Sequence, residues 1–444
     1  MPQVVRIEKM SFGGAGFGRV DGKACFVPFT APQDVCGIRT KRDKRSYMEG
    51  ELIDLFETSP LRTVPTCPVF GECGGCSWQY LTYPAQLDAK QEIFAEMLWR
   101  SARVPVERVE SIICAVETYG YRSRVQVKLH CSGGSFRIGF YRTGSHYVVD
   151  IPGECAIAHP AINHALTEIR PLLASCPDLS RVPQIDLAAG DDGAVIAIFH
   201  YIGSHYREFH EYLLENRACI ASVSGIFLQR GRKSTIVKVA GVDFLSYRIP
   251  AELLPGSSPL ALTFSRGGFS QVNYPQNQSL ISTVCDWAKP GPEDKLLDLF
   301  CGNGNFSIPL AVCAAKVIGM ENYPPSIADA ARNAVANGVL NADFICCDVA
   351  TGVKDMATKG KTFDVVIMDP PRTGAMDVVR HIPLLKPRAI IYVSCDPATL
   401  ARDLNDLRNS GYEVVKSRPL DMFPQTYHIE SVTLLEPLNG EQIQ

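Results

Sequence analysis

Cys395 is the residue whose setting most suggests covalent chemistry. It lies in the segment 392–403, YVSCDPATLARD, where an apolar run typical of a buried strand leads directly into a helix. The unpaired N–H groups at the start of a helix carry partial positive charge, which favours the thiolate of a nearby cysteine and raises its reactivity. We therefore interpret Cys395 as a nucleophile. The alternative is a small buried apolar residue, the usual role of a single cysteine.

A second group of cysteines has a spacing suited to metal binding. Cys67, Cys73 and Cys76 lie within ten residues, and Gly74 and Gly75 let the intervening backbone wrap closely. All-thiolate ligation suits either an iron–sulfur cluster or structural zinc, and spacing does not decide between them. A fourth ligand is needed, and the downstream candidates are Cys114, Cys131 and Cys155.

The turn 301–306, CGNGNF, indicates an adenosyl cofactor. It lacks the third glycine of the dinucleotide fingerprint, and no basic residue stands ready for a pyrophosphate. Gly302 and Gly304 allow close backbone approach to a methionine moiety, and Glu321, 19 residues after Gly302, can accept hydrogen bonds from ribose hydroxyls. Asp348 ends the next predicted strand, where the adenine amino group would lie. Each acid alone could be a capping residue, but together they predict an S-adenosylmethionine site.

Two further carboxylates suggest a reaction centre. Asp369 is followed by Pro370 and Pro371, which fix the backbone and hold the Asp side chain at the rim of the site. Glu430 lies in a mostly apolar strand, where partial burial would raise its pKa by desolvation and suit it to act as a general base. The alternative for Glu430 is an edge-strand acid exposed to water.

A thiol, a methyl donor and a base meet the needs of methyl transfer to C5 of a pyrimidine. This carbon is a poor nucleophile until a thiolate adds at C6, and the C5 proton must then be removed before the thiol leaves. Cys395, S-adenosylmethionine and Glu430 would supply these three functions, provided that the fold holds them rigidly together.

The elements after residue 295 are expected to position these groups. Strands and helices alternate there, which predicts a doubly wound, mainly parallel α/β sheet with its ligand beyond the carboxyl ends of the strands. This is the Rossmann-like arrangement of a class I S-adenosylmethionine-dependent methyltransferase. The predicted strands are 295–300, 316–322, 342–348, 363–369 and 389–394, and we expect a late antiparallel strand at 427–437.

Two other domains are predicted ahead of this one. Short strands and a glycine-rich stretch indicate an OB-like β-barrel over residues 1–59, and a central mixed α/β domain follows over 60–265, before the methyltransferase domain at 266–444. The central segment begins with an amphipathic helix over 84–101, whose apolar face we place at Leu87, Phe94, Met97 and Leu98. A strand over 121–130 then presents a cationic face suited to an RNA backbone, although an ordinary solvated face is the commoner explanation; its polar residues are Arg122, Arg124, Gln126 and Lys128.

Composition narrows the class of protein. The 444 residues are 46% hydrophobic and 20% charged, as expected for a soluble globular protein. No apolar run is long enough to span a membrane and the N-terminus lacks a signal peptide's apolar core, so we expect a cytoplasmic protein. Its 16 cysteines should therefore be thiols, metal ligands or a nucleophile. The formal charge of −3 means that any RNA must be bound by local basic patches.

The combined motifs resemble the RNA uracil-C5-methyltransferase family. The resemblance is to the branch that acts on 23S rRNA and has a TRAM domain, an OB-like RNA-binding module, together with a [4Fe-4S] cluster. It extends over nearly the whole chain and rests on the glycine-rich N-terminal module, CPVFGECGGC with Cys155, FSQVN, LLDLFCGNGNFSIPLA, MDPPRTG, YVSCDPATLARDL and FPQTYHIESV.

The resemblance implies a role for particular residues. The nucleophile falls on Cys395 and the base on Glu430, while Phe269 would lie near a target uridine flipped out of an RNA loop. The cluster ligands would be Cys67, Cys73, Cys76 and Cys155. The cofactor would be held by Gln271, Phe300, Asn305, Glu321, Asp348 and Asp369.

The resemblance also implies partners. RNA would be gripped by the TRAM module and by Arg122, Arg124 and Lys128; we expect a monomer, with neither DNA nor a membrane as a partner. Two departures from the family pattern are Asp396, where many relatives have Asn, and Asp348, where some have an amide.

Three rival interpretations remain. The same reaction on a tRNA uridine is the nearest. An RNA cytosine-C5-methyltransferase is disfavoured because Arg372 follows the proline pair where that group usually has a cysteine. A non-catalytic RNA-binding protein with a degenerate methyltransferase fold is disfavoured because Cys395, Glu430 and the cofactor acids are all present.

Overall fold

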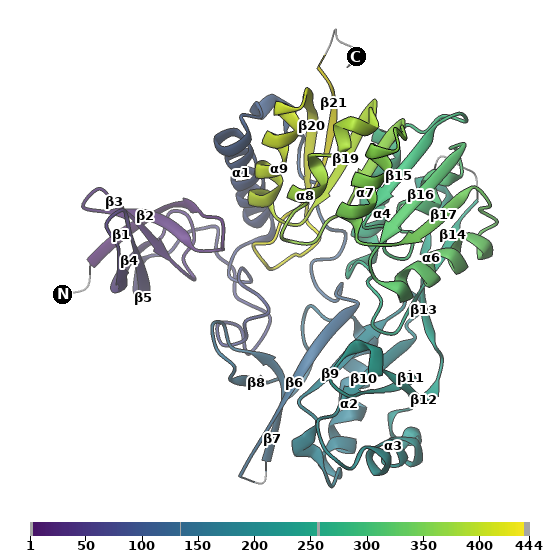
Figure 1. Ribbon diagram of the computed structural model, residues 1–444. Helices are drawn as coiled ribbons and strands as arrows, with labels where there is room; N and C mark the ends of the chain where they lie inside the picture. Colours follow the sequence, from purple (N-terminus) through teal and green to yellow (C-terminus); the bar gives the residue numbers. More distant parts are fainter. Residues whose placement is uncertain (1–2, 134, 255–257, 439–444) are drawn as a thin grey trace.

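The computed structural model describes residues 3–133, 135–254 and 258–438. The chain forms an N-terminal barrel, a central mixed-sheet domain and a C-terminal α/β domain (Figure 1). In that view the barrel stands to one side, and the C-terminal domain lies above the central one. Of the described helices, none combines the length and apolar character needed to cross a membrane.

The barrel is closed, as predicted, with strand order β1-β2-β3-β5-β4. Glycine lets its strands approach closely: a Cβ at Gly18 would lie 2.3 Å from the Arg6 carbonyl oxygen. Val5, Ile7, Val27 and Ile38 fill the interior. The strands are β1 (Gln3–Met10), β2 (Gly16–Val20), β3 (Lys23–Val27), β4 (Val35–Asp43) and β5 (Tyr47–Glu57).

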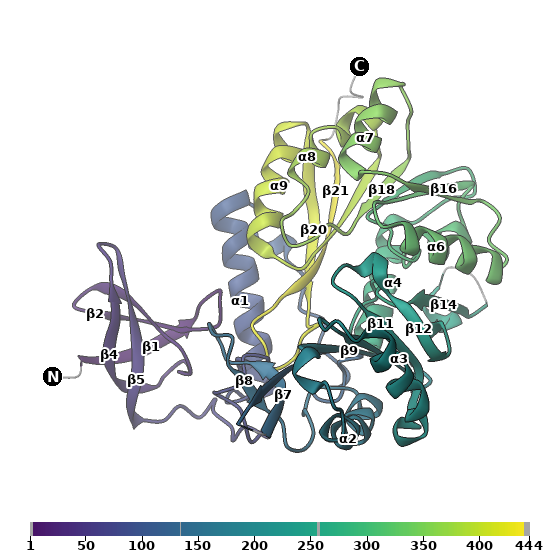
Figure 2. The ribbon, with the colours of Figure 1, turned by 60° about the horizontal axis from the view of Figure 1, so that its bottom comes forward.

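The central domain is a seven-stranded mixed sheet in the order β12-β11-β10-β9-β6-β7-β8. Helices α2 (Pro160–Ala174) and α3 (Tyr206–Glu215) belong to this domain (Figure 2). Its strands are β6 (Arg124–Ser132), β7 (Ser135–Tyr141), β8 (Val148–Asp150), β9 (Gln184–Ala189), β10 (Val195–His200), β11 (Val223–Gln229) and β12 (Val237–Gly241).

Helix α1 (Tyr83–Ala102) differs from its prediction in two ways. Phe94 and Leu98 are buried, but Leu87 and Met97 are only half-buried, because Ala89 and Ile93 lie on the face that packs. Chain order groups α1 with the central domain, whereas its buried side chains join the core of the C-terminal domain beside α9 (Pro397–Asn409). Local periodicity shows that a helix has an apolar face, but not which surface covers that face.

The C-terminal sheet has the predicted doubly wound architecture, with strand order β17-β16-β15-β18-β19-β21-β20. The first five of these strands run parallel, and β21 pairs antiparallel with both β19 and β20. Strand β20 is an addition to the predicted set. The strands are β15 (Lys295–Leu299), β16 (Lys316–Glu321), β17 (Ala342–Cys346), β18 (Val365–Met368), β19 (Ala389–Ser394), β20 (Tyr412–Leu420) and β21 (Glu430–Pro437).

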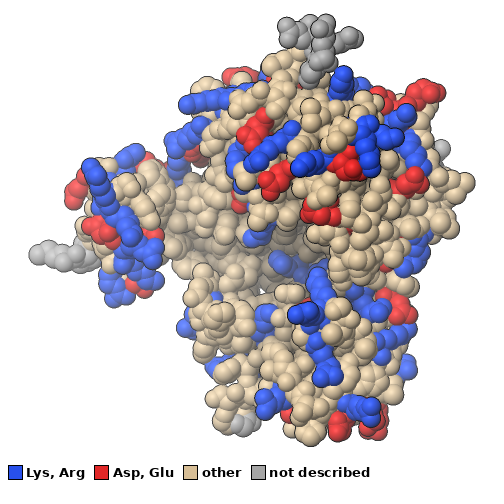
Figure 3. Space-filling view, in the orientation of Figure 1, with Lys and Arg blue, Asp and Glu red and all other residues tan. Residues whose placement is uncertain are grey.

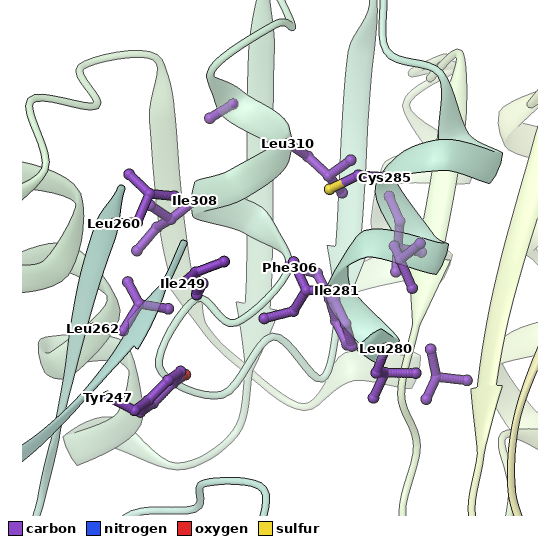
Figure 4. Packing of buried hydrophobic residues seen from close by; sticks show 14 of the residues in the cluster. Tyr247, Ile249, Leu260, Leu262, Leu280, Ile281, Cys285, Phe306, Ile308 and Leu310 are labelled. Carbon is purple, nitrogen blue, oxygen red and sulfur yellow. The ribbon is translucent and has the colours of Figure 1, made fainter. Parts of the chain in front are cut away.

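Helices cover this sheet and connect its strands. Strands β13 (Phe244–Ile249) and β14 (Leu260–Ser265) pack with α4 and α5 into one apolar core, where Tyr247, Leu262, Ile281 and Phe306 converge (Figure 4). This core supports the turn that follows β15. The helices are α4 (Tyr274–Ala288), α5 (Ser307–Ala311), α6 (Pro324–Ala336), α7 (Val349–Thr358) and α8 (Met376–Val379), followed by α9.

Candidate active site

The pairing of β19 with β21 brings the two predicted reacting groups together. Ser394 pairs with Ser431, and the Ser431 hydroxyl donates a hydrogen bond to the Ser394 carbonyl oxygen at 3.3 Å. Continuing this antiparallel register by one residue places Cys395 opposite Glu430. The thiol and the carboxyl group therefore emerge at the same end of the sheet.

Both residues open onto one cavity of about 530 Å³ at the carboxyl ends of the parallel strands. Phe269 and Gln271 come to it from the segment before α4, and Asp369 from the end of β18. A pocket at this edge is where doubly wound sheets bind ligands. The other predicted residues that line it are Phe300, Gly302, Asn305 and Glu321.

The glycine turn shapes one wall of this cavity. Phe300, Gly302 and Gly304 have φ angles of 63°, 55° and 88°, so the backbone curls through the left-handed region there. A Cβ at Gly302 would meet no atom within 4 Å, which leaves space beside the backbone for a ligand. Asn305 is held by reciprocal side-chain hydrogen bonds with Asn277, both at 2.9 Å. The turn therefore fits an adenosyl cofactor.

The two predicted cofactor acids differ in placement. Glu321 lines the cavity, and its Oε1 accepts hydrogen bonds from the backbone N–H groups of Asn322 and Tyr323 at 2.8 and 2.9 Å. Asp348 instead caps α7: its Oδ1 accepts from the Thr351 hydroxyl at 2.7 Å and from the Thr351 N–H at 2.9 Å, and these hydrogen bonds lower the pKa of Asp348. Asp348 is exposed and is not among the cavity-lining residues.

Carboxyl groups cluster on the buried side of the cavity. Burial, together with the nearby charge of Asp298, raises the pKa of Asp369 to about 7, and the Gln271 amide donates to Asp369 Oδ2 at 3.3 Å. Burial likewise raises the pKa of Asp298 to about 7. Burial raises the pKa of Glu430 well above its ordinary value, and Asp369 adds to this shift. This outcome agrees with the desolvation predicted for Glu430, which is 2% exposed.

The prediction that the helix N-terminus favours the Cys395 thiolate is wrong for the protein without cofactor or RNA. Burial, and then the charges of Glu430 and Asp369, raise the pKa of Cys395 to about 12. The start of α9 is also occupied, because Asp396 Oδ1 accepts from the N–H groups of Ala398 and Thr399, both at 3.0 Å. Desolvation and carboxylate charge thus outweigh the helix dipole, whose effect is typically ~1 kcal/mol.

Arg372 and Phe423 are among the cavity-lining residues that sequence reasoning gave no role. Arg372 lines the cavity, and its charge lowers the pKa of both Cys395 and Glu430, opposing the effect of burial. The signal for Arg372 was its position directly after Pro370 and Pro371, which follow β18 and Asp369. Phe423 also lines the cavity; it lies in the connection between β20 and β21 and is the first residue of the FPQTYHIESV motif.

The four predicted metal-ligating cysteines line a separate cavity of about 360 Å³. These are Cys67, Cys73, Cys76 and Cys155, while Cys114 and Cys131 are not among its lining residues. In the described parts of the chain, no three His, Cys, Asp or Glu side chains are placed to hold a single metal ion. The fold therefore gathers the four thiols around a wide space without converging them on one point.

The predicted RNA-contacting residues have varied surroundings. Phe269 is 57% exposed at the rim of the active-site cavity. Arg122 and Arg124 line the cysteine cavity, and burial lowers the pKa of Arg124, so the two arginines do not form the simple exposed face expected from alternation. Lys128 lies 5.4 Å from the centre of the Tyr141 ring. Figure 3 shows Lys and Arg side chains over the barrel and beside the hollow between the other two domains.

The fold and the cavity define a class I methyltransferase that uses S-adenosylmethionine. The family model described as tRNA (Uracil-5-)-methyltransferase matches residues 82–438, and the TRAM domain model matches residues 3–53. The chain therefore belongs to the RNA (uracil-5-)-methyltransferase family and has an N-terminal TRAM domain.

Full-length relatives support the same assignment. The 23S rRNA (uracil(1939)-C(5))-methyltransferase RlmD of Alcanivorax borkumensis is 32% identical, over 98% of this chain and 97% of the relative. The protein of the same name from Salmonella typhimurium is 33% identical, over 97% and 95%. The crystal structure of Pyrococcus abyssi tRNA (uracil-54, C5)-methyltransferase in complex with S-adenosyl-L-homocysteine aligns with a TM-score of 0.73 at 26% identity, covering 98% of this chain and all of that one.

Proposed function

We propose that this protein transfers a methyl group from S-adenosylmethionine to C5 of a uridine in 23S rRNA, giving 5-methyluridine. The observation that carries the proposal is the placement of Cys395 opposite Glu430, on the cavity that also contains the glycine turn. The choice of rRNA is supported by relatives that cover nearly the whole chain and are named for that substrate.

Each reacting residue has one task in this proposal. S-adenosylmethionine supplies an electrophilic methyl group. The Cys395 thiolate adds to C6 of the uracil, which forms an S–C bond and makes C5 nucleophilic. Once C5 carries the methyl group, Glu430 takes the C5 proton, the S–C6 bond breaks, and the ring double bond is restored. Because Arg372 lowers the pKa of Cys395, it assists the first of these steps.

We assign cofactor binding to cavity-lining residues. The backbone around Phe300 and Asn305 would accommodate the methionine portion, and Glu321 would accept hydrogen bonds from the ribose. Gln271 and Asp369, already joined by a hydrogen bond, would face the methyl-transfer centre. The adenine contact of Asp348 stays a prediction, because one of its carboxylate oxygens caps α7.

We further propose that Cys67, Cys73, Cys76 and Cys155 bind a [4Fe-4S] cluster. A zinc ion would need all four sulfur atoms about 2.3 Å from one point. A cluster instead needs four thiolates spread around a larger body. The four cysteines around a 360 Å³ cavity suit the larger body of a cluster. Since the proposed reaction transfers no electrons, its role would be structural.

RNA binding is the remaining part of the proposal. The TRAM barrel, together with Arg122, Arg124 and Lys128, would contact the backbone around the target. Phe269 would stack on the flipped uracil at the rim of the cavity. We propose that the protein acts as a monomer.

The proposal is tested with purified protein, methyl-labelled S-adenosylmethionine, and RNA from cells that lack the gene. We expect label in 23S rRNA. Primer extension and mass spectrometry should locate the labelled nucleoside and identify it as 5-methyluridine alone. Label in tRNA alone would contradict the choice of rRNA and would indicate a tRNA substrate, as for the Pyrococcus abyssi enzyme. Failure to label any RNA, with S-adenosylmethionine bound, would overturn the enzymatic proposal.

A further inference from the structure

The segment 421–429 joins β20 to β21 and is here called the 421–429 loop. Phe423 lies near its start, and Glu430 follows its last residue. Both Phe423 and Glu430 line the active-site cavity. In Figure 2 this yellow connection runs past one end of α1. The conformation of the loop therefore determines where these two side chains enter the cavity.

A pair of glutamines fixes the middle of this loop. Gln86 of α1 is fully buried; its Nε2 donates to Gln425 Oε1 at 3.0 Å, and its Oε1 accepts from the Gln425 N–H at 2.9 Å. Gln86 Nε2 also donates to the carbonyl oxygens of Trp78 and Leu81, at 3.2 and 3.0 Å. Gln425 has a φ of 68°, an unusual conformation for a residue other than glycine, so surrounding contacts must hold it.

The segment directly after Cys76 holds the same loop. The N–H groups of Ser77 and Trp78 both donate to the Gln425 carbonyl oxygen, at 3.0 and 2.9 Å. The Ser77 hydroxyl oxygen accepts from the Tyr427 N–H at 3.1 Å. Cys76 lines the cysteine cavity, so one continuous backbone segment connects that cavity with the 421–429 loop.

A buried ion pair anchors the start of the loop. Lys90, one turn after Gln86 on α1, donates to Asp421 Oδ1 at 2.5 Å and to the Phe423 carbonyl oxygen at 3.1 Å. Both charged side chains are fully buried. Because a buried charge without its partner is strongly unfavourable, this contact holds the start of the loop against α1.

We infer that Gln86 is a positioning residue, which acts through Gln425 and the Ser77–Trp78 segment to hold Glu430 opposite Cys395. The inference rests on the proposed function. Glu430 is the first residue of β21, so its place depends on the loop before it. Removing the glutamine pair should displace Glu430 more than Cys395, which follows the buried strand β19.

The test compares Gln86→Leu with Gln91→Leu. Gln91 lies on the same helix and bonds backbone groups, the Glu110 carbonyl oxygen and the Ile112 N–H, but not the loop. For Gln86→Leu we expect turnover at least about tenfold lower, unchanged S-adenosylmethionine affinity, and a covalent adduct with unmodified RNA that accumulates on denaturing gels. Release needs Glu430, whereas formation of the adduct does not. Gln91→Leu should match the wild type.

Two further measurements, hydrogen exchange of the loop and the behaviour of a second variant, test the positioning role of Gln86. Hydrogen exchange of peptides covering 421–432 should be faster in Gln86→Leu and unchanged in Gln91→Leu, and this readout needs no activity. Gln425→Gly, which suits the φ at that position and removes only the side-chain partner, should accumulate the adduct in the same way. If neither variant accumulates adduct while the wild type methylates RNA, the inference is wrong. If the wild type methylates no RNA, the proposed function fails instead.

Discussion

Cys395 and Glu430 each lie one residue beyond Ser394 and Ser431, the last pair of the β19–β21 ladder, and both line one cavity. This antiparallel pairing joins the two reacting groups, although 35 positions separate 395 from 430 in the chain. One of the two lies at the carboxyl end of a buried strand and the other at the amino end of its neighbour. Their shared cavity explains how addition and proton removal can act on one base.

The first prediction concerns these two residues. Cys395→Ala should abolish both methyl transfer and covalent trapping by RNA that contains 5-fluorouridine, because Cys395 supplies the thiolate that adds to C6 in the proposed mechanism. Glu430→Gln should form a methylated adduct but release it about 10²–10⁴-fold more slowly, the usual cost of losing a general base. Gel mobility and mass spectrometry of the adduct check both outcomes.

The matched control for the thiol is Cys114→Ala, since Cys114 is exposed and lines neither cavity. It should retain normal turnover and trapping. Trapping that persists in Cys395→Ala would show that another residue is the nucleophile.

The second prediction concerns the pKa of Cys395 in the free protein. Burial and two carboxylates raise this pKa to about 12, so alkylation of Cys395 by iodoacetamide should accelerate with increasing pH beyond neutrality. Arg372→Leu removes the cation that lowers the pKa and should shift the profile to higher pH. Glu430→Gln removes a carboxylate that raises it and should shift the profile to lower pH.

Peptide mass spectrometry measures alkylation at Cys395 separately from the other cysteines. Identical profiles for Arg372→Leu, Glu430→Gln and the wild type would contradict the electrostatic account. A control substitution, Arg380→Leu, lies outside the cavity lining and should leave the profile unchanged.

The third prediction concerns stability. Burial raises the pKa of Asp298 from its ordinary 3.8 to about 7, and one of its oxygens, Oδ1, has no hydrogen-bond partner in the described structure. Between about pH 4 and 7 the folded state holds a proton that the unfolded chain releases. Through this group, the free energy of unfolding therefore falls as pH rises across that range.

Asp298→Asn removes this pH dependence and keeps an acceptor for the Ser307 hydroxyl. At pH 8 the variant should be more stable than the wild type by on the order of a few kcal/mol, and near pH 4 the two should be similar. Urea unfolding at both pH values measures the difference. A variant that is destabilised more at pH 8 than at pH 4 would refute the assigned cause.

The fourth prediction concerns the cysteine cavity. Cys155→Ser should lower the iron and sulfide content per chain. Cys131→Ser should not, because Cys155 lines the cavity and Cys131 does not. If the cluster orders the segment after Cys76, its chemical removal should also speed hydrogen exchange in the 421–429 loop. Metal analysis that finds zinc with no sulfide would contradict the cluster and indicate a single zinc ion at these cysteines.

Much of the catalytic domain could be predicted because its signals are local. Strand 389–394 was placed correctly to the residue, and the other predicted strands of the sheet were found with shifted ends. Parallel strands direct their carboxyl ends to one edge, which predicts the shared cavity of the glycine turn, Glu321 and Asp369.

Local sequence patterns were thus enough to predict the alternation of strands and helices, the glycine turn for an adenosyl cofactor, and the residue types able to do the chemistry. The three-dimensional structure was needed to show that Glu430 and Cys395 share one cavity and that α1 packs on the C-terminal domain. It also brings Cys155 to the other three cysteines, as the family resemblance implied. It also reversed the expected effect on the Cys395 thiol. Local propensity and turn chemistry act over a few residues, whereas strand partners, burial and charge proximity depend on segments far apart in the chain.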